Sequence, residues 1–377
     1  MDVLHPVDGA AIVDIRLCRQ CLRAKGTLPL LAADLPLKRL KHQAVSRLPT
    51  LLRKARDALL EFLGNLQGRG YRHGVTMVTP GNGTQKMATK VFLDYDQKAL
   101  DDAYDQAVYA PNREQVVGRF ATESDRARDM LGAPERLAYG DLPIEGMDLF
   151  RTRRTGLAPV VVFVHGGAWQ RGLAQNYAFP APAVTGAGAH YIAIDFQNVT
   201  ETKGDLMPMA LQVRSAIAWV VKNCARYGGD PARVHVVGHS SGAHLAGCAA
   251  ITDWKADHGL PADAVKGYTL VSGMYDLRGP RLSKRSAYVK FTDAVEDALS
   301  AQRHLDHINA PIALVYGTLE TPEFQRQSSD FATALSKAGK RVSLLRAEGY
   351  NHFEICETLA NPYGPAGRVM LEQMGLS

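Results

Sequence analysis

The stretch Val234-His-Val-Val-Gly-His-Ser-Ser-Gly242 reads as a strand that runs directly into a sharp turn. Three β-favouring residues lead into a Gly-x-Ser-x-Gly pentapeptide, and the small residues at 243–250 after it are typical of a closely packed helix. A serine on a strained turn needs neighbours without side chains, and Gly238 and Gly242 supply them. The order of strand, turn and helix predicts that Ser240 stands at the carboxyl end of a sheet, as a candidate nucleophile.

Outward from this stretch, buried-strand patterns and helical patterns alternate along the chain. This alternation predicts an α/β fold, with a mainly parallel central sheet, helices on both faces and ligands bound outside the carboxyl ends of the strands. Strands are expected at 136–139, 147–151, 159–165, 190–196, 234–238, 267–272, 312–316 and 342–347. Helices are expected at 206–227, 241–253 and 322–337, and helical spacing also occurs at 99–107 and 116–131.

Composition and charge exclude several classes of protein. With 46% hydrophobic and 22% charged residues, the 377-residue chain is typical of a globular protein, and no apolar run reaches the roughly 18 residues of a membrane span. The net charge of +6 comes from residues 1–86, where 14 Lys and Arg face 6 Asp and Glu, whereas residues 87–377 hold 30 against 32. We therefore expect neither a nucleic-acid partner nor a membrane partner for the main body of the chain.

Residues 1–86 are interpreted as a basic, poorly ordered and dispensable N-terminal extension, with one amphipathic helix candidate at 48–66. They lack the features of a signal peptide. From Met87 onward the numbers of basic and acidic residues are nearly balanced. The hypothesis is therefore that the functional protein begins near Met77 or Met87. Residues 87–377 would then form the catalytic domain.

The five cysteines are scattered and odd in number, which argues against a disulfide framework and predicts a reducing compartment, hence a cytoplasmic protein. Cys18 and Cys21 have the spacing of half a zinc site, but no second pair follows them, so the spacing is interpreted as accidental.

A glycine loop upstream of Ser240 supplies candidate oxyanion donors. The apolar strand at 159–165 ends in His165-Gly-Gly-Ala-Trp169, where paired glycines let the backbone approach a substrate closely. The N–H of Gly166 or Gly167 is expected to join that of Ser241 in binding a developing oxyanion.

A candidate acid and a candidate base lie downstream of Ser240. Glu320 follows the strand at 312–316 and is ranked first as the acid, with Asp276, beyond the strand at 267–272, as the alternative. Glu323 is expected to cap or face the next helix. His352 lies in the loop after the last strand, so that serine, acid and histidine occur in the order expected of this architecture.

With these residues assembled, the chain resembles the α/β-hydrolase superfamily, and within it the kynurenine formamidase (arylformamidase)-like and esterase group. The resemblance covers roughly residues 90–357. It rests on the motifs at 165–169, 238–245, 272–277, 321–328 and 351–353. Two positions depart from the group: Ala168 stands where tyrosine is usual, which implies a different or wider pocket, and Glu320 stands where aspartate is usual.

The resemblance implies a serine acyl hydrolase without metal or organic cofactor, which acts on a small-molecule ester or amide. It places the helical segment 94–131 near the pocket mouth and makes 277–305 a candidate lid or specificity element. The oligomeric state is left open, with a homodimer as one alternative. Aromatic residues in or near the surrounding loops are candidates for the pocket wall, namely Trp169, Phe179, Phe196, Tyr350 and Phe353.

Three basic residues, Arg281, Lys284 and Arg285, cluster in the 277–305 connection. They could meet a carboxylate of the substrate or form a solvated basic face. Three functions stay open. The chain could be an arylformamidase, a carboxylesterase of broader range, or a non-catalytic ligand-binding protein; the last is disfavoured because no member of the candidate triad is missing.

Overall fold

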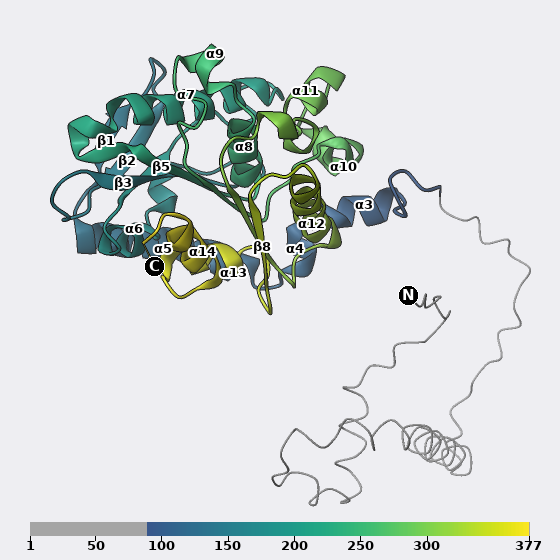
Figure 1. Cartoon of the computed structure of the whole chain (residues 1–377). Helices are drawn as coiled ribbons and strands as arrows, with labels where there is room; N and C mark the ends of the chain where they lie inside the picture. Colours follow the sequence, from purple (N-terminus) through teal and green to yellow (C-terminus); the bar gives the residue numbers. More distant parts are fainter. Residues whose placement is uncertain (1–88, 377) are drawn as a thin grey trace, which may run out of the picture. The chain divides into compact units, whose positions relative to one another are not determined.

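The computed structural model describes residues 89–376 (Figure 1). The interpretations of residues 1–86, including the amphipathic segment and the Cys18–Cys21 spacing, lie outside the described residues. Within the described part, no helix is long and apolar enough to cross a membrane.

An eight-stranded sheet forms the centre of the fold, in the order β1-β2-β4-β3-β5-β6-β7-β8. β2 pairs antiparallel with both of its neighbours, and every other pairing is parallel. The predicted mainly parallel sheet is therefore confirmed. The strands are β1 (Glu135–Ala138), β2 (Gly146–Phe150), β3 (Ala158–Val164), β4 (His190–Ile194), β5 (Gly229–His239), β6 (Tyr268–Val271), β7 (Ile312–Gly317) and β8 (Val342–Ala347).

Helices cover both faces of the sheet, as predicted (Figure 1). One face carries α7 (Met207–Asn223), α8 (Ser241–Ala250) and α12 (Pro322–Lys337), and the other carries α5 (Arg113–Leu131), α6 (Ala181–Gly186) and α14 (Pro365–Gln373). Each set buries its own hydrophobic cluster against the sheet. The shorter helices are α3 (Gln97–Ala103), α4 (Gln106–Tyr109), α9 (Trp254–His258), α10 (Arg278–Leu282), α11 (Asp293–Ala298) and α13 (Glu354–Glu357).

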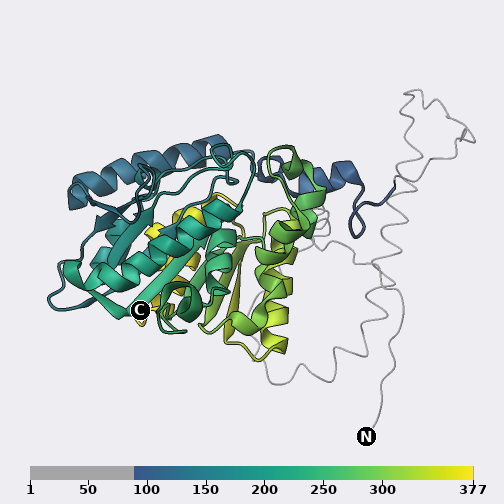
Figure 2. The same cartoon turned by 90° about the horizontal axis from the view of Figure 1, so that it is seen from above.

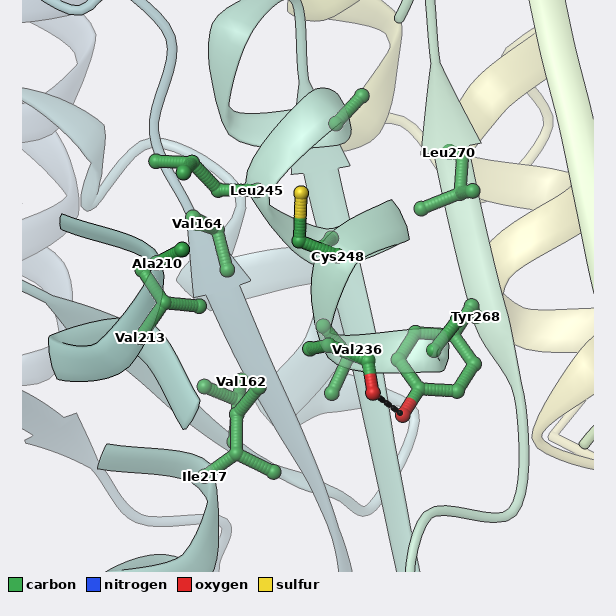
Figure 3. Packing of buried hydrophobic residues seen from close by; sticks show 14 of the residues in the cluster. Val162, Val164, Ala210, Val213, Ile217, Val236, Leu245, Cys248, Tyr268 and Leu270 are labelled. Atoms are coloured by element: carbon green, nitrogen blue, oxygen red, sulfur yellow. Dashed lines mark hydrogen bonds between the residues drawn. The ribbon is translucent and has the colours of Figure 1, made fainter. Parts of the chain in front are cut away.

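The helix after the central strand, α8, is rich in small residues and packs against the sheet. All ten of its residues are buried. Figure 3 shows Leu245 and Cys248 of α8 among side chains of β3, β5 and β6, with residues of α7 alongside. The Tyr268 hydroxyl of β6 donates a hydrogen bond to the Ala249 carbonyl at 3.3 Å. This close packing fixes the position of the turn that precedes α8.

Several element limits differ from the predicted ones: β5 begins at Gly229, and the segment 99–107 forms two helices, α3 and α4. Two further differences have local reasons. The predicted helix 206–227 ends as an α-helix at Asn223 and continues as a 3₁₀ turn at Cys224–Tyr227. The predicted helix 241–253 ends at Ala250, because the Asp253 side chain accepts hydrogen bonds from the backbone of Lys255 and Ala256 and so caps α9.

The 277–305 connection contains α10 and α11, with the 3₁₀ turn η3 (Lys284–Ala287) between them and a second 3₁₀ turn, Ala301–Arg303, after α11. It lies beside α3, as both cartoon views show (Figures 1 and 2). The Gln97 side chain of α3 donates to the Leu282 carbonyl of α10 at 2.9 Å. Two segments that are far apart in the chain thus meet at this end of the molecule.

Candidate active site

The turn between β5 and α8 has the geometry expected of a strained nucleophile. Ser240 has φ 57° and ψ −124°, a backbone conformation that side-chain-bearing residues rarely adopt. A Cβ at Gly242 would lie 2.1 Å from the Val164 carbonyl oxygen, and one at Gly238 would lie 2.5 Å from the Gly242 carbonyl oxygen. Only glycine fits at either position, so α8 can approach β3 closely enough to hold Ser240 at the end of the sheet.

Two consecutive hydrogen bonds connect the candidate serine, histidine and acid. His352 Nε2 lies 2.8 Å from Ser240 Oγ, and His352 Nδ1 lies 2.7 Å from Glu320 Oε2. A carboxylate can only accept, so Nδ1 carries the proton and Nε2 accepts from the serine hydroxyl. All three side chains are buried. This arrangement is the one in which a histidine can take a proton from serine while a carboxylate orients the ring.

Further contacts hold the Glu320 carboxylate in one orientation. Its Oε1 accepts from Ser272 Oγ at 2.6 Å and from the Gly317 backbone amide at 2.7 Å. Sequence reasoning did not single out Ser272 as a site residue. The signal was present, because Ser272 directly follows β6 as Glu320 follows the neighbouring β7, and adjacent parallel strands end at the same edge.

The alternative carboxylates have other partners. Asp276 accepts from Arg303 Nη2 at 2.9 Å and from the Arg278 amide at 2.8 Å. Glu323 lies in the first turn of α12, as expected, but it is fully buried and receives two hydrogen bonds from Arg326. Among residues 89–376, the carboxylate hydrogen-bonded to the His352 ring is therefore Glu320.

The glycine loop lies directly against the turn. A Cβ at Gly166 would be 3.0 Å from the Ser240 Cβ, and Gly167 has φ +121°, which favours glycine. The Trp169 amide donates to Ser241 Oγ at 3.1 Å and ties the loop to the start of α8. Within the described part of the chain, the amides of Gly166, Gly167 and Ser241 have no hydrogen-bond acceptor. Their hydrogen-bonding capacity is therefore not used by the described part of the chain.

The five aromatic residues predicted for the pocket wall lie in different places. Phe353 meets the His352 ring edge-on at 5.2 Å, and Tyr350 is partly buried in the same loop. Phe179 lies in the hydrophobic cluster of the α5 face, stacked on Phe120 at 5.1 Å. Its position is explained by the turn after Tyr177, which leads the chain into α6 on that face.

The two remaining aromatic residues line a cavity of about 80 Å³ beside the glycine loop. Phe196 stacks on the His165 ring at 4.3 Å, and Trp169 is buried with its indole N–H donating to His244 Nδ1 at 3.2 Å. Neither Ser240 nor His352 lines this cavity. An aromatic residue that sequence reasoning missed, Phe324 of α12, lies with its ring 4.9 Å from the His352 ring.

The helical segment 94–131 contacts the loop that carries His352. The Asn112 side chain donates to Glu354 Oε1 at 2.6 Å and accepts from the Asn351 side chain at 2.8 Å. Tyr104, at the end of α3, donates through its hydroxyl to Glu323 at 2.8 Å. The segment thus braces the two elements, α12 and the histidine loop, that flank the candidate base.

Three other histidines of this region are buried and held neutral. Burial, reinforced by His352, lowers the pKa of His239 to about 3, and its Nε2–H donates to the His352 carbonyl at 2.8 Å. Burial is also the largest cause that lowers the pKa of His244 and of His235 to about 4. His239 and His244 are interpreted as neutral hydrogen-bonding groups that support the site, whereas the buried Nδ1 of His235 has no hydrogen-bond partner.

These depressed pKa values predict that acid destabilises the protein. In the unfolded chain a histidine has a pKa near 6.5, so the unfolded state binds more protons between about pH 6.5 and pH 4. The contribution of these histidines to the free energy of unfolding is therefore fully present above about pH 6.5. It falls as the pH drops, by up to about 2 kcal/mol per histidine at about pH 5. Urea unfolding at about pH 7 and at about pH 5 measures the difference.

The variant His235→Gln provides the control for this prediction, because His235 lies on β5 away from Ser240. We expect a smaller difference between the two urea midpoints in this variant than in the native protein. An unchanged difference would show that the buried histidine does not contribute to the acid sensitivity.

The sequence is similar to a protein family model and to known hydrolases. Residues 147–277 match the BD-FAE family model. The kynurenine formamidase of Salmo salar is 31% identical over 265 residues, which cover 67% of this chain and 86% of the relative. Esterase LipC of Mycobacterium tuberculosis is 30% identical over 226 residues, or 56% of this chain and 55% of the relative.

The fold has solved counterparts. The crystal structure of carboxyl esterase 2 from Tuber melanosporum superposes with a TM-score of 0.53 at 20% identity, over 64% of this chain and 86% of that chain. At this level of identity the likeness concerns the fold.

Proposed function

Because the chain belongs to the kynurenine formamidase and esterase group of α/β-hydrolases, we propose that it cleaves an aryl formamide through Ser240, His352 and Glu320. That it is a hydrolase of the ester or formamide type follows from its relatives. The observation that carries the assignment of residues is the hydrogen-bonded chain from Ser240 Oγ through the imidazole to the Glu320 carboxylate.

In the proposed first half-reaction, His352 Nε2 removes the Ser240 proton as Oγ attacks the formyl carbon. The negative charge that develops on the carbonyl oxygen is bound by the amides of Gly166 or Gly167 and Ser241. The imidazolium, oriented by Glu320, then donates its proton to the nitrogen of the breaking C–N bond. The aryl amine leaves, and the formyl group stays on Ser240 as an ester.

In the second half-reaction, water replaces the amine. His352 removes a proton from the water, which attacks the formyl-serine carbon, and the same amides bind the second oxyanion. Collapse of this intermediate returns the proton to Ser240 Oγ and releases formate. Apart from the substrate and water, the cycle uses only groups that the chain supplies.

A carboxylesterase acting on small aromatic or aliphatic esters is the second candidate. It is favoured by the relatedness to esterases, and the same residues would perform the reaction, because an alkoxide or phenoxide leaves more easily than an amine. A non-catalytic ligand-binding role is the least favoured, since it gives no reason for a buried serine, histidine and carboxylate to be hydrogen-bonded to one another.

The scattered cysteines support a reducing, cytoplasmic location. Cys224, Cys248 and Cys356 are free and buried.

Side-by-side kcat/KM measurements on N-formylkynurenine, its N-acetyl analogue and a set of p-nitrophenyl esters test the proposal. We expect N-formylkynurenine to be cleaved about 10- to 200-fold better than the acetyl analogue, which is the discrimination that one additional methyl group supports. Hydrolysis of the esters without cleavage of the formamide would instead assign the protein to the carboxylesterases. The absence of hydrolysis of every compound would contradict the catalytic proposal itself.

A further inference from the structure

Of the three clustered basic residues in the 277–305 connection, only Arg285 points into the protein. Arg281 is partly exposed and pairs with Asp293 and Glu296, and Lys284 is exposed and pairs with Asp105. Arg285, which lies in the 3₁₀ turn η3, is only 7% exposed. The same segment thus carries a solvated basic face and one buried guanidinium.

Aromatic rings surround this guanidinium. Its Cζ atom lies 5.4 Å from the ring centre of Trp169 and 5.9 Å from those of Tyr104 and Phe324. These three residues are called the aromatic cage below. Cation–π attraction partly offsets the cost of removing the charge from water, but it brings no negative charge.

No carboxylate in residues 89–376 forms an ion pair with Arg285. Glu323, which accepts from the Tyr104 hydroxyl, is already bound to Arg326 through both of its oxygens. A buried charge without a counter-ion is costly, and buried arginines are ordinarily paired. The cage therefore holds a positive charge that the described chain does not neutralise.

The guanidinium also has hydrogen-bond donors to spare. Of its five N–H groups, one on Nη1 binds the Tyr288 hydroxyl at 2.9 Å and one on Nη2 binds the Tyr104 carbonyl at 3.0 Å. The buried Nε–H has no partner. Nε together with Nη2 forms the edge of a guanidinium that a carboxylate commonly binds with both oxygens.

The cage adjoins the candidate active site on two sides. Trp169 directly follows the glycine loop, and its amide is bound to Ser241. The Phe324 ring is close to both the guanidinium and the candidate base, since its centre lies 5.9 Å from Arg285 Cζ and 4.9 Å from the His352 ring. An anionic group held at Arg285 would therefore be one aromatic ring away from the groups that would cleave the substrate.

We propose that Arg285 binds a carboxylate of the substrate, so that the protein selects esters or formamides that carry a negative charge near the scissile bond. This inference rests on the proposed function, of which it names the substrate class. The substrate carboxylate supplies the missing counter-ion and accepts from the unused Nε–H. Arg285 is also a structural link, since it joins the 277–305 connection to Tyr104, but that link uses one donor and explains neither the bare charge nor the free Nε–H.

Two pairs of substrates, each differing only in the charge, test the proposal. N-Formylkynurenine and its carboxamide carry the difference on the leaving group, whereas p-nitrophenyl monoadipate and p-nitrophenyl adipamate carry it on the acyl group. The measured quantity is the ratio of kcat/KM for the anionic and the neutral member of each pair. The ratio cancels the concentration of active enzyme, so partial unfolding of a variant does not affect it.

In the native protein we expect the anionic member to be preferred in at least one pair. Arg285→Gln should lower that ratio by about 10- to 100-fold, the loss typical of a hydrogen bond to a charged group. Arg285→Lys, which keeps the charge but loses the planar fork, should retain part of the preference. Arg281→Gln is the matched control, because it removes a paired arginine from the same segment, and it should leave the ratio within about twofold.

Equal cleavage of anionic and neutral substrates by the native protein, or an unchanged ratio in Arg285→Gln, would overturn the inference while leaving the hydrolase proposal intact. Should Arg285→Gln fail to fold, Arg285→Met serves as the second charge-removing variant. Should no substrate be cleaved, the proposed function fails, and calorimetric titration with 4-phenylbutanoate and 4-phenylbutanamide decides the inference separately. Tighter binding of the carboxylate that is lost in the variant supports the site, and equal binding of the two compounds refutes it.

Discussion

Replacement of Ser240 by alanine is expected to lower kcat on a p-nitrophenyl ester by a factor on the order of 10⁴ to 10⁶. The variant lacks the oxygen that lies 2.8 Å from His352 Nε2, so no acyl intermediate can form. The fold should persist, because alanine keeps the Cβ of serine at this strained position and the lost hydroxyl forms a single hydrogen bond there. Steady-state kinetics measure the first effect and thermal unfolding the second.

Ser241→Ala is the matched control for this substitution. It removes a hydroxyl from the adjacent position, which releases the Trp169 amide, but it keeps the backbone amide proposed to bind the oxyanion. We expect a smaller loss of kcat than in Ser240→Ala. Full activity of Ser240→Ala, or equal losses in the two variants, would contradict the role of Ser240 as nucleophile.

Replacement of Glu320 by glutamine is expected to lower kcat by a factor on the order of 10³ to 10⁴. A neutral amide cannot stabilise the imidazolium that forms during attack, and its NH₂ group can face Nδ1 and favour the wrong tautomer of His352. The contacts from Ser272 and Gly317 reach the other oxygen and hold the side chain in place. The measurement is kcat on the same ester.

Asp276→Asn is the comparison that ranks the two candidate acids. Its partner Arg303 also binds Glu296, so the loss of this partly exposed pair should cost at most about 1 kcal/mol of stability and alter kcat only slightly. A larger loss of kcat in Asp276→Asn than in Glu320→Gln would transfer the role of the acid to Asp276.

Much of the architecture could be read from neighbouring residues. The helix predicted at 322–337 and the strand predicted at 342–347 have the observed limits, and the strand, turn and helix around Ser240 occur in the predicted order. A continuous apolar run along a strand that is buried on both faces is a local property, as is an apolar repeat every three to four residues along a helix, and both are therefore visible in the sequence. The need for glycine at 238 is also local, because a Cβ there would meet the Gly242 carbonyl, whereas Gly242 is required by the Val164 carbonyl of β3.

The grouping of Ser240, Glu320 and His352 could also be anticipated, since each follows a strand and parallel strands end at a common edge. Their mutual distances could not. Glu320 and Asp276 both lie beyond strand ends. The choice between them depends on the pairing of β6 with β7, which places Ser272 within hydrogen-bonding distance of Glu320. It also depends on Arg303, which binds the Asp276 carboxylate.

Only contacts between distant segments distinguish residues that look alike in the chain. Phe179 and Phe324 are both phenylalanines near loop ends, yet one packs on α5 and the other faces His352. Arg281 and Arg285 lie four positions apart, yet one is paired near the surface and the other is buried among rings. Sequence periodicity determined which segments form strands and helices, whereas the packing of those segments against each other decided which side chains meet, because that packing depends on the shape and charge of partners remote in the sequence.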